Sequence, residues 1–536
     1  MESYVTLNQK LQPETRNCTI DNTTHGGIAS TTEMSPAKKS SSFAYRAHPH
    51  LYEINTWAWL EELSAKLGRK IGLRDVPDTE WDNIACLGFD FVWLMGVWER
   101  SPVGRRFFQT DPPSFSGFDA ALPGWKLSQI VGSPYSVFRY KPDPQIGSWA
   151  DLDFVRAKLR ERHVGLILDF VANHTAPDHP WTKSHPEYYV SGAQDNFRQN
   201  PSDFYLVETK PEPNLLAHGR DPYFPPWRDV VQLNYFEPAA RSALIAQLRT
   251  LAKHCDGVRC DMAMLVLNDI FARTWGPLLA GCESPPREFW SEAIAAVPEF
   301  VWLAEVYWNC EGPIQSLGFQ FTYDKGLYDA LRDGHIDEVH SRLSADLAAQ
   351  SCTARFLENH DEARSATVFG SAKREAFGTL IATLPGMRFY HHGQLDGRKI
   401  HLPIPLAMAA PEAPNVETRA FYERILKLSN QSVFHSGQWR LLEIESGGDD
   451  TFHNLVAYQW LSEDCRNAVI VNLSHAESQA RVRFPSGISA SQQYTFLDQL
   501  HDVRYSRAGE EIVQSGLYVR LDAYRAHLFD ITPASA

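Results

Sequence analysis

The chain has 536 residues, a formal net charge of -14 at pH 7 and 12% aromatic side chains. This length is several times that of a typical domain, so the chain can build one large hydrophobic core and a smaller second domain. The acidic balance argues against nucleic acids and anionic membranes as partners, and no apolar run of about eighteen residues predicts a membrane-spanning helix.

The first segment, residues 1–46, is rich in Ser, Thr and Asn and lacks the apolar stretch of a secretory signal. A polar segment of this kind cannot bury enough apolar surface to fold, so we expect a disordered leader. Without a secretion signal, the expected location of the protein is the cytoplasm.

Apolar runs alternate with helical stretches from residue 47 to residue 432. The runs predicted as strands cover residues 51–56, 91–95, 165–170, 257–261, 300–305, 318–322, 354–357 and 387–390. Strands separated by helices are typical of a parallel sheet, because each crossover connection must return the chain to the same edge. Eight such strands predict an α/β fold, a (β/α)8 TIM barrel that forms the main domain.

Two segments depart from this alternation. Residues 175–233 are rich in Pro and aromatic residues with little helical periodicity, so we expect a loop-rich insertion, or lid, after the third strand. From residue 433 to residue 536, short runs of alternating apolar and polar residues predict a C-terminal antiparallel β-sandwich domain with a structural role.

Three carboxylates, Asp261, Glu305 and Asp361, each end a short apolar run. In a barrel of parallel strands the C-terminal ends of the strands converge on one mouth, so these side chains are expected to face one pocket. Any one of them alone could instead cap a helix or pair with an Arg. Arg259 lies two residues before Asp261, so alternation directs both side chains to the same face and Cys260 to the other.

Glycoside hydrolysis typically uses a pair of carboxylates beside the scissile bond. One carboxylate attacks the sugar or activates a water molecule, and the other protonates the leaving oxygen. Five short segments add to this pattern in chain order: residues 169–174, 231–235, 259–261, 304–306 and 359–361. Four of them resemble the signature regions of the alpha-amylase family of retaining glycoside hydrolases and transglycosidases. The stretch 231–235 resembles the motif that this family places before its fourth strand.

The resemblance implies a role for each carboxylate. Asp261 corresponds to the nucleophile, Glu305 to the acid/base and Asp361 to the third carboxylate, which binds sugar hydroxyls. Arg259 should favour the ionised form of Asp261. Glu305 needs a raised pKa, which we expect from repulsion by the other two carboxylates and from the apolar walls Val306 and Tyr307.

The resemblance also implies residues that bind substrate. His174 and His360 are expected to share the binding of sugar hydroxyls with Asp361. Tyr135 resembles the stacking platform under the sugar at the cleaved bond, while plain packing is the alternative for this ring. Tyr307 is included because it stands beside the acid/base.

Two positions depart from the family pattern. Met262–Leu265 are apolar where many starch-cutting relatives carry a Lys-His pair, which argues against a starch-degrading endo-amylase. Asn173 stands where calcium-binding members supply a ligand, but calcium prefers six to eight oxygens and we find no such set. We therefore predict no metal and no cofactor, with a structural calcium ion left open.

The sequence thus predicts a retaining glycosidase that acts on alpha-glucosidic bonds of oligosaccharides or small glucosides through a covalent glycosyl-enzyme intermediate. The first alternative is an alpha-glucosyl transferase or sugar isomerase that uses the same site. A second, from a different class, is a binding module that has lost catalysis; the presence of all three carboxylates argues against it.

Overall fold

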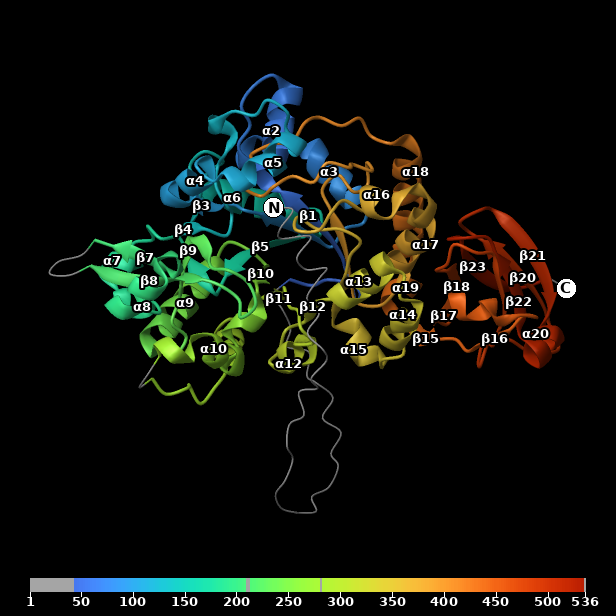
Figure 1. The fold of residues 1–536 in the computed structure, drawn as a ribbon. Helices are drawn as coiled ribbons and strands as arrows, with labels where there is room; N and C mark the ends of the chain where they lie inside the picture. Colours follow the sequence, from blue (N-terminus) through green and yellow to red (C-terminus); the bar gives the residue numbers. More distant parts are fainter. Residues whose placement is uncertain (1–42, 209–212, 280–281, 535–536) are drawn as a thin grey trace, which may run out of the picture.

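The computed structural model describes residues 43–208, 213–279 and 282–534. The predicted leader therefore lies outside the described residues except for positions 43–46. Figure 1 shows a central barrel with a smaller unit on each side, the insertion in green and the C-terminal domain in red. Within the described ranges, no helix combines the length and the hydropathy that crossing a bilayer requires.

Eight parallel strands close into a barrel in the order β1-β14-β13-β12-β11-β10-β5-β2, which confirms the predicted fold class. The strands are β1 (His50–Asn55), β2 (Phe91–Met95), β5 (Gly165–Val171), β10 (Gly257–Asp261), β11 (Val301–Ala304), β12 (Phe321–Tyr323), β13 (Thr353–Arg355) and β14 (Met387–His391). Every residue of β2, β5, β10, β11 and β14 is buried, as expected for strands enclosed by helices on the outside.

Helices surround the barrel and connect its strands. They are α2 (Thr56–Leu67), α3 (Asp78–Cys86), α6 (Trp149–Arg160), α9 (Pro238–Leu251), α10 (Asn268–Trp275), α11 (Phe289–Ala296), α12 (Glu311–Ser316), α13 (Lys325–Asp333), α14 (Ile336–Leu343), α15 (Leu347–Ser351), α16 (Ser365–Val368), α17 (Gly370–Thr383) and α18 (Val416–Ser429). In α2 the side chain of Asn55 caps the amide of Ala58, and Gly68 ends the helix with φ 66°.

Two strand boundaries differ from the sequence prediction by more than one residue. The sixth strand begins at Phe321 rather than at residue 318, because Gly318 has φ 113° and the side chain of Gln320 accepts the amide of Trp302. The seventh ends at Arg355 rather than at residue 357, because pairing with the neighbouring strands stops there although Phe356 and Leu357 stay buried.

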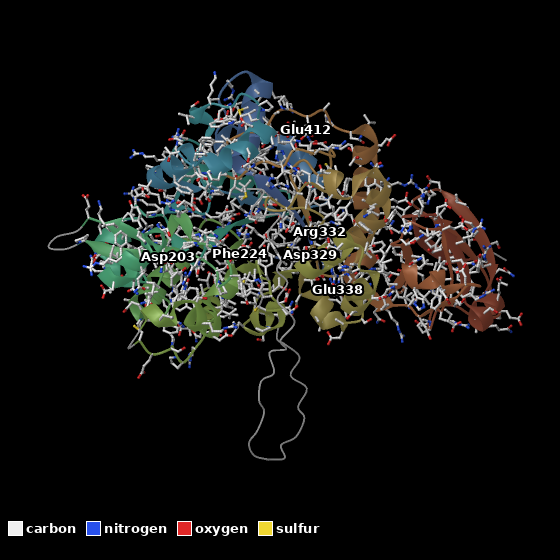
Figure 2. All side chains as sticks on the ribbon, viewed as in Figure 1. Asp203, Phe224, Asp329, Arg332, Glu338 and Glu412 are labelled. Carbon is white, nitrogen blue, oxygen red and sulfur yellow. The ribbon has the colours of Figure 1, made fainter. Side chains whose placement is uncertain are left out.

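The insertion after β5 contains more regular structure than the loop-rich segment that the sequence predicts. It forms a four-stranded antiparallel sheet in the order β6-β9-β8-β7, and Figure 2 labels Phe224 in the connection between β8 and β9. Its elements are β6 (His174–Thr175), α7 (Trp181–Ser184), α8 (Gln194–Gln199), β7 (Phe204–Val207), β8 (Asn214–Gly219) and β9 (Trp227–Gln232). A register shift at His218 and Gly219 interrupts the alternation that would mark the strands in the sequence.

A second excursion, which the sequence analysis did not predict, separates β2 from β5. It consists of the hairpin β3 (Trp98–Arg100) and β4 (Val137–Pro142) and the helices α4 (Pro102–Gln109) and α5 (Pro112–Ala121). The sharp turn before β4 contains Tyr135, which packs into the barrel core at 9% exposure.

The C-terminal domain is built from antiparallel strands in two sheets. One has the order β15-β17-β18-β23-β20-β21 and the other β16-β19-β22, and a second apolar core lies between them. The strands are β15 (Gln438–Leu441), β16 (Ile444–Ser446), β17 (Leu455–Leu461), β18 (Arg466–Asn472), β19 (Ser478–Val482), β20 (Gln493–Asp498), β21 (Val503–Ala508), β22 (Leu517–Leu521) and β23 (Ala526–Pro533). This arrangement fits the predicted sandwich.

Candidate active site

Three acidic residues stand at the C-terminal ends of barrel strands. Asp261 ends β10, Glu305 directly follows β11, and Asp361 lies in the loop after β13. The side chains of Asp261 and Glu305 are 7% and 5% exposed, whereas that of Asp361 is 42% exposed. Two carboxylates are thus enclosed by the barrel and the third faces its open mouth.

Arg259 connects the two enclosed carboxylates. Its Nη1 donates to Asp261 Oδ1 at 2.8 Å, and its Nη2 lies 2.7 Å from Glu305 Oε2. The guanidinium is fully buried. The rings of Trp93 and Tyr135 pack against it, with their centroids 5.1 and 5.2 Å from Arg259 Cζ. Arg259 and Asp261 therefore face the same side of β10, as alternation predicts.

Glu305 has further partners on both carboxylate oxygens. Tyr307 donates its hydroxyl to Oε1 at 2.7 Å, and the backbone amide of Met262 donates to Oε2 at 2.7 Å. Burial, opposed by Arg259 and reinforced by the charges of Asp261 and Asp361, raises the pKa of Glu305 to about 7.

The direction of this shift agrees with the sequence prediction, but its causes differ in two ways. Burial outweighs repulsion by the other carboxylates. Tyr307 does not act as an apolar wall, because its hydroxyl donates to Glu305 and a donor stabilises the ionised carboxylate, which lowers the pKa.

Asp261 illustrates the competition between burial and pairing. Burial raises the pKa of this carboxyl above its ordinary value, while the charge of Arg259 and the hydrogen bond from it act in the opposite direction. The effect of Arg259 has the predicted sign and does not fully offset the loss of hydration.

Asp361 belongs to a chain of charged groups. His360 Nε2 lies 3.0 Å from Asp361 Oδ2, and His360 Nδ1 lies 2.5 Å from Glu53 Oε1. Burial alone would lower the pKa of His360, but the charges of Asp361 and Glu53 raise it well above its ordinary value. Burial likewise acts against ionisation of Asp361, yet the charge of His360 lowers the pKa of Asp361 to about 2. The geometry thus favours an ionised Asp361 beside an imidazolium.

The predicted substrate-binding residues adjoin these carboxylates. The hydroxyl of Tyr135 lies 2.6 Å from His360 Nε2, and the Tyr135 ring packs over Arg259. His174 starts the insertion, and burial lowers its pKa to about 3, so it is a neutral hydrogen-bonding group. Its ring contacts Trp227, with centroids 5.5 Å apart.

Sequence reasoning missed Glu53 and Tyr323. Glu53 lies within β1 and is fully buried, and Tyr323 ends β12 with its hydroxyl 3.3 Å from Arg259 Nε. A carboxylate inside an apolar strand is a signal that could have identified Glu53, because a buried charge needs a partner. No comparable signal marks Tyr323, since aromatic residues are common in barrel strands.

The departures from the family pattern have clear structural counterparts. Residues 263–266 are buried and form a short 3-10 helix behind the site. The oxygen Oδ1 of Asn173 accepts a hydrogen bond from Gln232 Nε2 at 2.9 Å, so this oxygen already has a protein partner.

Two exposed aromatic rings lie close together near the acid/base. Tyr223 from the insertion is 58% exposed and Trp308, three residues after Glu305, is 36% exposed. Their ring centroids are 5.0 Å apart in an edge-to-face arrangement. Trp308 and Asn309 both have positive φ, 62° and 57°, which turns the chain sharply after Tyr307.

A small cavity of about 20 Å³ adjoins His360. Charged and imidazole side chains of its wall are Glu62, Arg364, His391, His392, Arg398 and Glu412. Arg398 and Glu62 form a pair of hydrogen bonds of 2.5 and 2.8 Å across part of this wall. This volume is enough for a water molecule and lies far below that of a site for a small ligand.

Comparison with known proteins points to one family. Residues 81–270 match the family model described as alpha amylase, catalytic domain. The chain is 27% identical over 282 residues to an alpha-amylase 3 from Dictyoglomus thermophilum, which covers 48% of this chain and 52% of that relative. It is also 24% identical over 330 residues to a palatinase from Erwinia rhapontici, and this alignment covers 51% of this chain and 57% of that relative. The chain thus spans about half the length of the curated relatives it matches.

Solved structures extend the likeness to almost the whole fold. The crystal structure of a noncanonic maltogenic alpha-amylase, AmyB, from Thermotoga neapolitana has a TM-score of 0.64 at 18% identity and covers 91% of this chain and 99% of that one. An alpha-amylase from Lactobacillus plantarum has a TM-score of 0.62 at 19% identity, covering 90% and 99%. The family-model match and the curated relatives thus indicate the alpha-amylase family, glycoside hydrolase family thirteen, and the solved structures show that its fold extends over almost the whole chain.

Proposed function

We propose that this protein is a retaining glycosidase that acts on alpha-glucosidic bonds of oligosaccharides or small glucosides. The observation that carries the proposal is the buried Arg259, which contacts both Asp261 and Glu305. Because both carboxylates contact one guanidinium, they lie close together. In retaining enzymes the two catalytic carboxyl groups are about 5 to 5.5 Å apart, which is closer than in inverting enzymes.

In this mechanism Asp261 attacks the anomeric carbon and forms a covalent glycosyl-enzyme intermediate. Glu305, whose pKa of about 7 keeps much of it protonated near neutrality, donates its proton to the leaving oxygen. The ionised Glu305 then takes a proton from water, and the resulting attack on the anomeric carbon releases the sugar and restores Asp261.

The remaining groups would hold the sugar ring. Asp361 and the His360 imidazolium offer an acceptor and a donor to secondary hydroxyls, and neutral His174 can do either. Tyr135 would stack under the ring, because its aromatic face is fixed over Arg259. A carbohydrate is therefore the proposed substrate, with neither nucleic acid nor membrane as a partner and no cofactor.

One feature near the site favours short substrates over starch. Residues 263–266, which follow Asp261 and Met262 in the chain, are buried and apolar, so their side chains offer no polar groups to an extended glucan. We expect action in the cytoplasm, which cell fractionation would test.

A mechanism-based 2-deoxy-2-fluoro glucosyl fluoride tests the proposed nucleophile. The fluorine slows both steps, and a good leaving group lets the intermediate accumulate, so peptide mass analysis should find the glucosyl group on Asp261. The Asp261→Asn variant should remain unlabelled. A label on another residue, or no label while a substrate is turned over, would contradict the proposal, and a protein that neither reacts nor turns over any substrate would fit a binding module instead.

A glucosyl transferase is the second candidate, supported by the exposed pair Tyr223 and Trp308. Trp308 lies three residues after the proposed acid/base, and an acceptor sugar stacked on this pair could resolve the intermediate in place of water. Incubation with maltose, maltotriose, trehalose, sucrose and soluble starch, followed by chromatography, separates the candidates. Free glucose indicates hydrolysis, whereas longer or isomeric products indicate transfer.

A further inference from the structure

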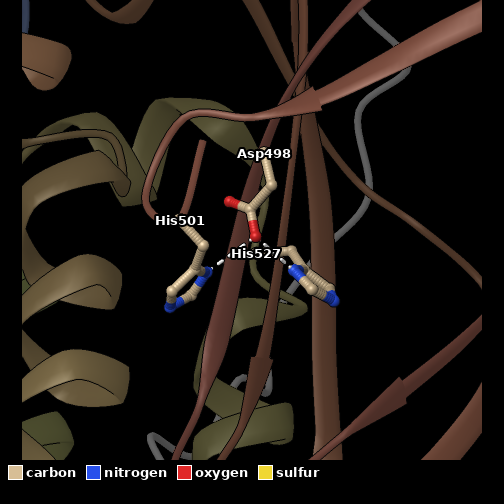
Figure 3. Close-up of side chains that lie close together, drawn as sticks. All are labelled: Asp498, His501 and His527. Atoms are coloured by element: carbon tan, nitrogen blue, oxygen red, sulfur yellow. Dashed lines mark hydrogen bonds and ion pairs between the residues drawn. The ribbon is translucent and has the colours of Figure 1, made fainter. Parts of the chain in front are cut away.

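Three side chains in the C-terminal domain direct ligand-type atoms at one point, as Figure 3 shows. Asp498 ends β20, His501 lies in the turn that follows, and His527 is near the start of β23. Asp498 Oδ2 is 2.7 Å from the Nδ1 atom of each imidazole, and the three atoms lie within 4.8 Å of one another. The cluster lies outside the barrel that carries the catalytic carboxylates.

Neighbouring groups orient two of the three ligands. The other oxygen of Asp498, Oδ1, accepts the backbone amide of Leu500 at 3.1 Å, which leaves Oδ2 toward the imidazoles. The far nitrogen of His501, Nε2, lies 3.3 Å from Glu375 Oε1 on α17. An imidazole that gives its second nitrogen to a carboxylate is the usual support of a metal-bound histidine.

The cluster is also accessible to an ion. The side chain of Asp498 is 1% exposed, while those of His501 and His527 are 25% and 14% exposed. The carboxylate is therefore held inside the sheet, and the imidazoles form the side that solvent reaches. Water from that side could supply a fourth ligand, which would complete a tetrahedron.

We propose that Asp498, His501 and His527 bind one divalent transition-metal ion of the zinc class. Two imidazole nitrogens and one carboxylate oxygen suit zinc and its neighbours, whereas calcium and magnesium require sets of oxygen ligands. The atoms must separate slightly from their present hydrogen-bond distances, because each would lie about 2.0 to 2.2 Å from the ion.

Metal binding releases to solvent the proton that His501 Nδ1 directs at Asp498 Oδ2. The far nitrogen, Nε2, lies 3.0 Å from Arg525 Nη2 and 3.3 Å from Glu375 Oε1. With metal on Nδ1 the remaining proton is on Nε2, where Glu375 accepts it. Arg525 keeps its other contact, from Nη1 to Glu375 Oε2 at 2.6 Å. The ion would link β20, β23 and, through Glu375, helix α17 of the barrel.

Calorimetric titration of the full-length protein with zinc chloride tests this proposal. We expect one ion per chain and a rise in the midpoint of thermal unfolding, because a ligand of the folded state stabilises it. His501→Gln and His527→Gln should not bind at the concentrations that saturate the wild type. Glutamine can still donate a hydrogen bond to Asp498, so both variants are expected to fold, which far-UV circular dichroism checks.

Three controls distinguish this site from others. Glu375→Gln should weaken binding on the order of tenfold, the smaller effect of a group that supports a ligand. His475→Gln, at an exposed histidine of the same domain, should change nothing. Cobalt substitution should give weak bands without thiolate charge transfer. Zinc binding that survives both histidine variants, a thiolate spectrum, or no binding at all would overturn the proposal.

Discussion

Asp261 and Glu305 share one counter-charge but are prepared for opposite tasks. Arg259 donates a hydrogen bond to Asp261, whereas Glu305 faces Nη2 as an ion-pair partner and accepts from Tyr307 and the Met262 amide. Burial raises the pKa of both carboxyls, and it takes that of Glu305 to about 7. The different hydrogen-bond partners of the two carboxyls support the proposed division into a nucleophile and an acid/base.

The first prediction concerns pH. A raised pKa means that Glu305 is protonated below about pH 7 and loses its proton above it, so kcat/KM should fall on the alkaline side as the acid disappears. Glu305→Gln should lower kcat about 10²- to 10⁴-fold on natural sugars. The loss should be much smaller for an aryl glucoside with a good leaving group, which needs no acid. A pH profile that is flat through this range would contradict the assignment.

The second prediction uses Tyr307. Its hydroxyl stabilises ionised Glu305, so Tyr307→Phe should move the alkaline limb of the profile to higher pH. Tyr518→Phe removes a hydroxyl in the C-terminal domain that donates to Gln479 and serves as the matched control. An unchanged or lowered limb in Tyr307→Phe would show that the hydrogen bond does not set the proton affinity of Glu305.

At this scale the sequence predicts residues whose chemistry follows from their type and their position at a strand end. Asp261, Glu305 and Arg259 could be grouped because parallel strands bring their ends together and because alternation has a period of two. The partner of Glu53 and the position of the Met262 amide could not be predicted, because the first contact joins residues 307 positions apart and the second depends on the left-handed turn after β10. The larger effect of burial on Glu305 also depends on the complete fold.

Among the elements, the connections after β10 and β11 shape the site. Met262 follows β10 with φ 42° and ψ 50°, which places its amide against Glu305. Trp308 follows Tyr307 with φ 62°, which brings its ring to Tyr223 of the insertion. Both turns use left-handed backbone at residues other than glycine, a conformation that costs about 1–2 kcal/mol and needs support from its surroundings.

The third prediction follows from the backbone at Met262. Met262→Gly should keep the fold and most of the activity, because glycine adopts positive φ without strain. Met262→Val should lower the thermal midpoint and the activity, since a β-branched residue is least suited to this conformation. Circular dichroism melts of both variants provide the measurement. Equal behaviour of the two would mean that the side chain, and not the backbone, matters here.

The fourth prediction concerns the aromatic pair. Trp308→Ala should raise KM for maltotriose by a factor of about two to ten, because stacking between aromatic rings contributes ~0.5–1.5 kcal/mol and contact with a sugar ring should be comparable. Leu206→Ala, at an exposed position of β7 in the insertion, is the control and should leave KM unchanged. If Trp308→Ala changes neither KM nor the ratio of transfer to hydrolysis, the pair does not contact the leaving group or an acceptor.

Prediction of elements succeeded where the pattern was local and continuous. The strand at Gly165–Val171 is an apolar run interrupted by a single Asp, which favours a strand buried on both faces. The insertion was harder, because its strands are short and pair with partners distant in sequence, and a bulge breaks their alternation. Gln320 shows how one side-chain hydrogen bond can move a boundary.

At the scale of the molecule, the C-terminal domain is part of the barrel's support. Trp460 and Tyr458 of β17 belong to the same buried core as the barrel, and both contact Thr383 at the end of α17. The Trp460 indole donates to the carbonyl oxygen of Thr383 at 2.8 Å, and the Tyr458 hydroxyl lies 2.7 Å from Thr383 Oγ1. We therefore expect barrel and sandwich to unfold together.

The fifth prediction tests this coupling. Trp460→Ala should cost about 3–5 kcal/mol, the usual loss for a large buried aromatic side chain. Urea unfolding followed by activity and by circular dichroism should give coincident transitions for both proteins, displaced to lower urea in the variant. Val503→Ala, on an exposed part of β21, should lie close to the wild type. Separate transitions for the two domains would refute the shared core.

Cys260, held between Arg259 and Asp261 along β10, is buried and faces away from the substrate side. Burial raises the pKa of its thiol well above the ordinary value, so reagents that react with thiolates will not attack it in the closed barrel. Alkylation of Cys260 therefore requires local opening of the strands beside Asp261. The rate of this alkylation, compared with that of exposed Cys86, would measure how often the barrel opens locally and whether a bound sugar makes opening rarer.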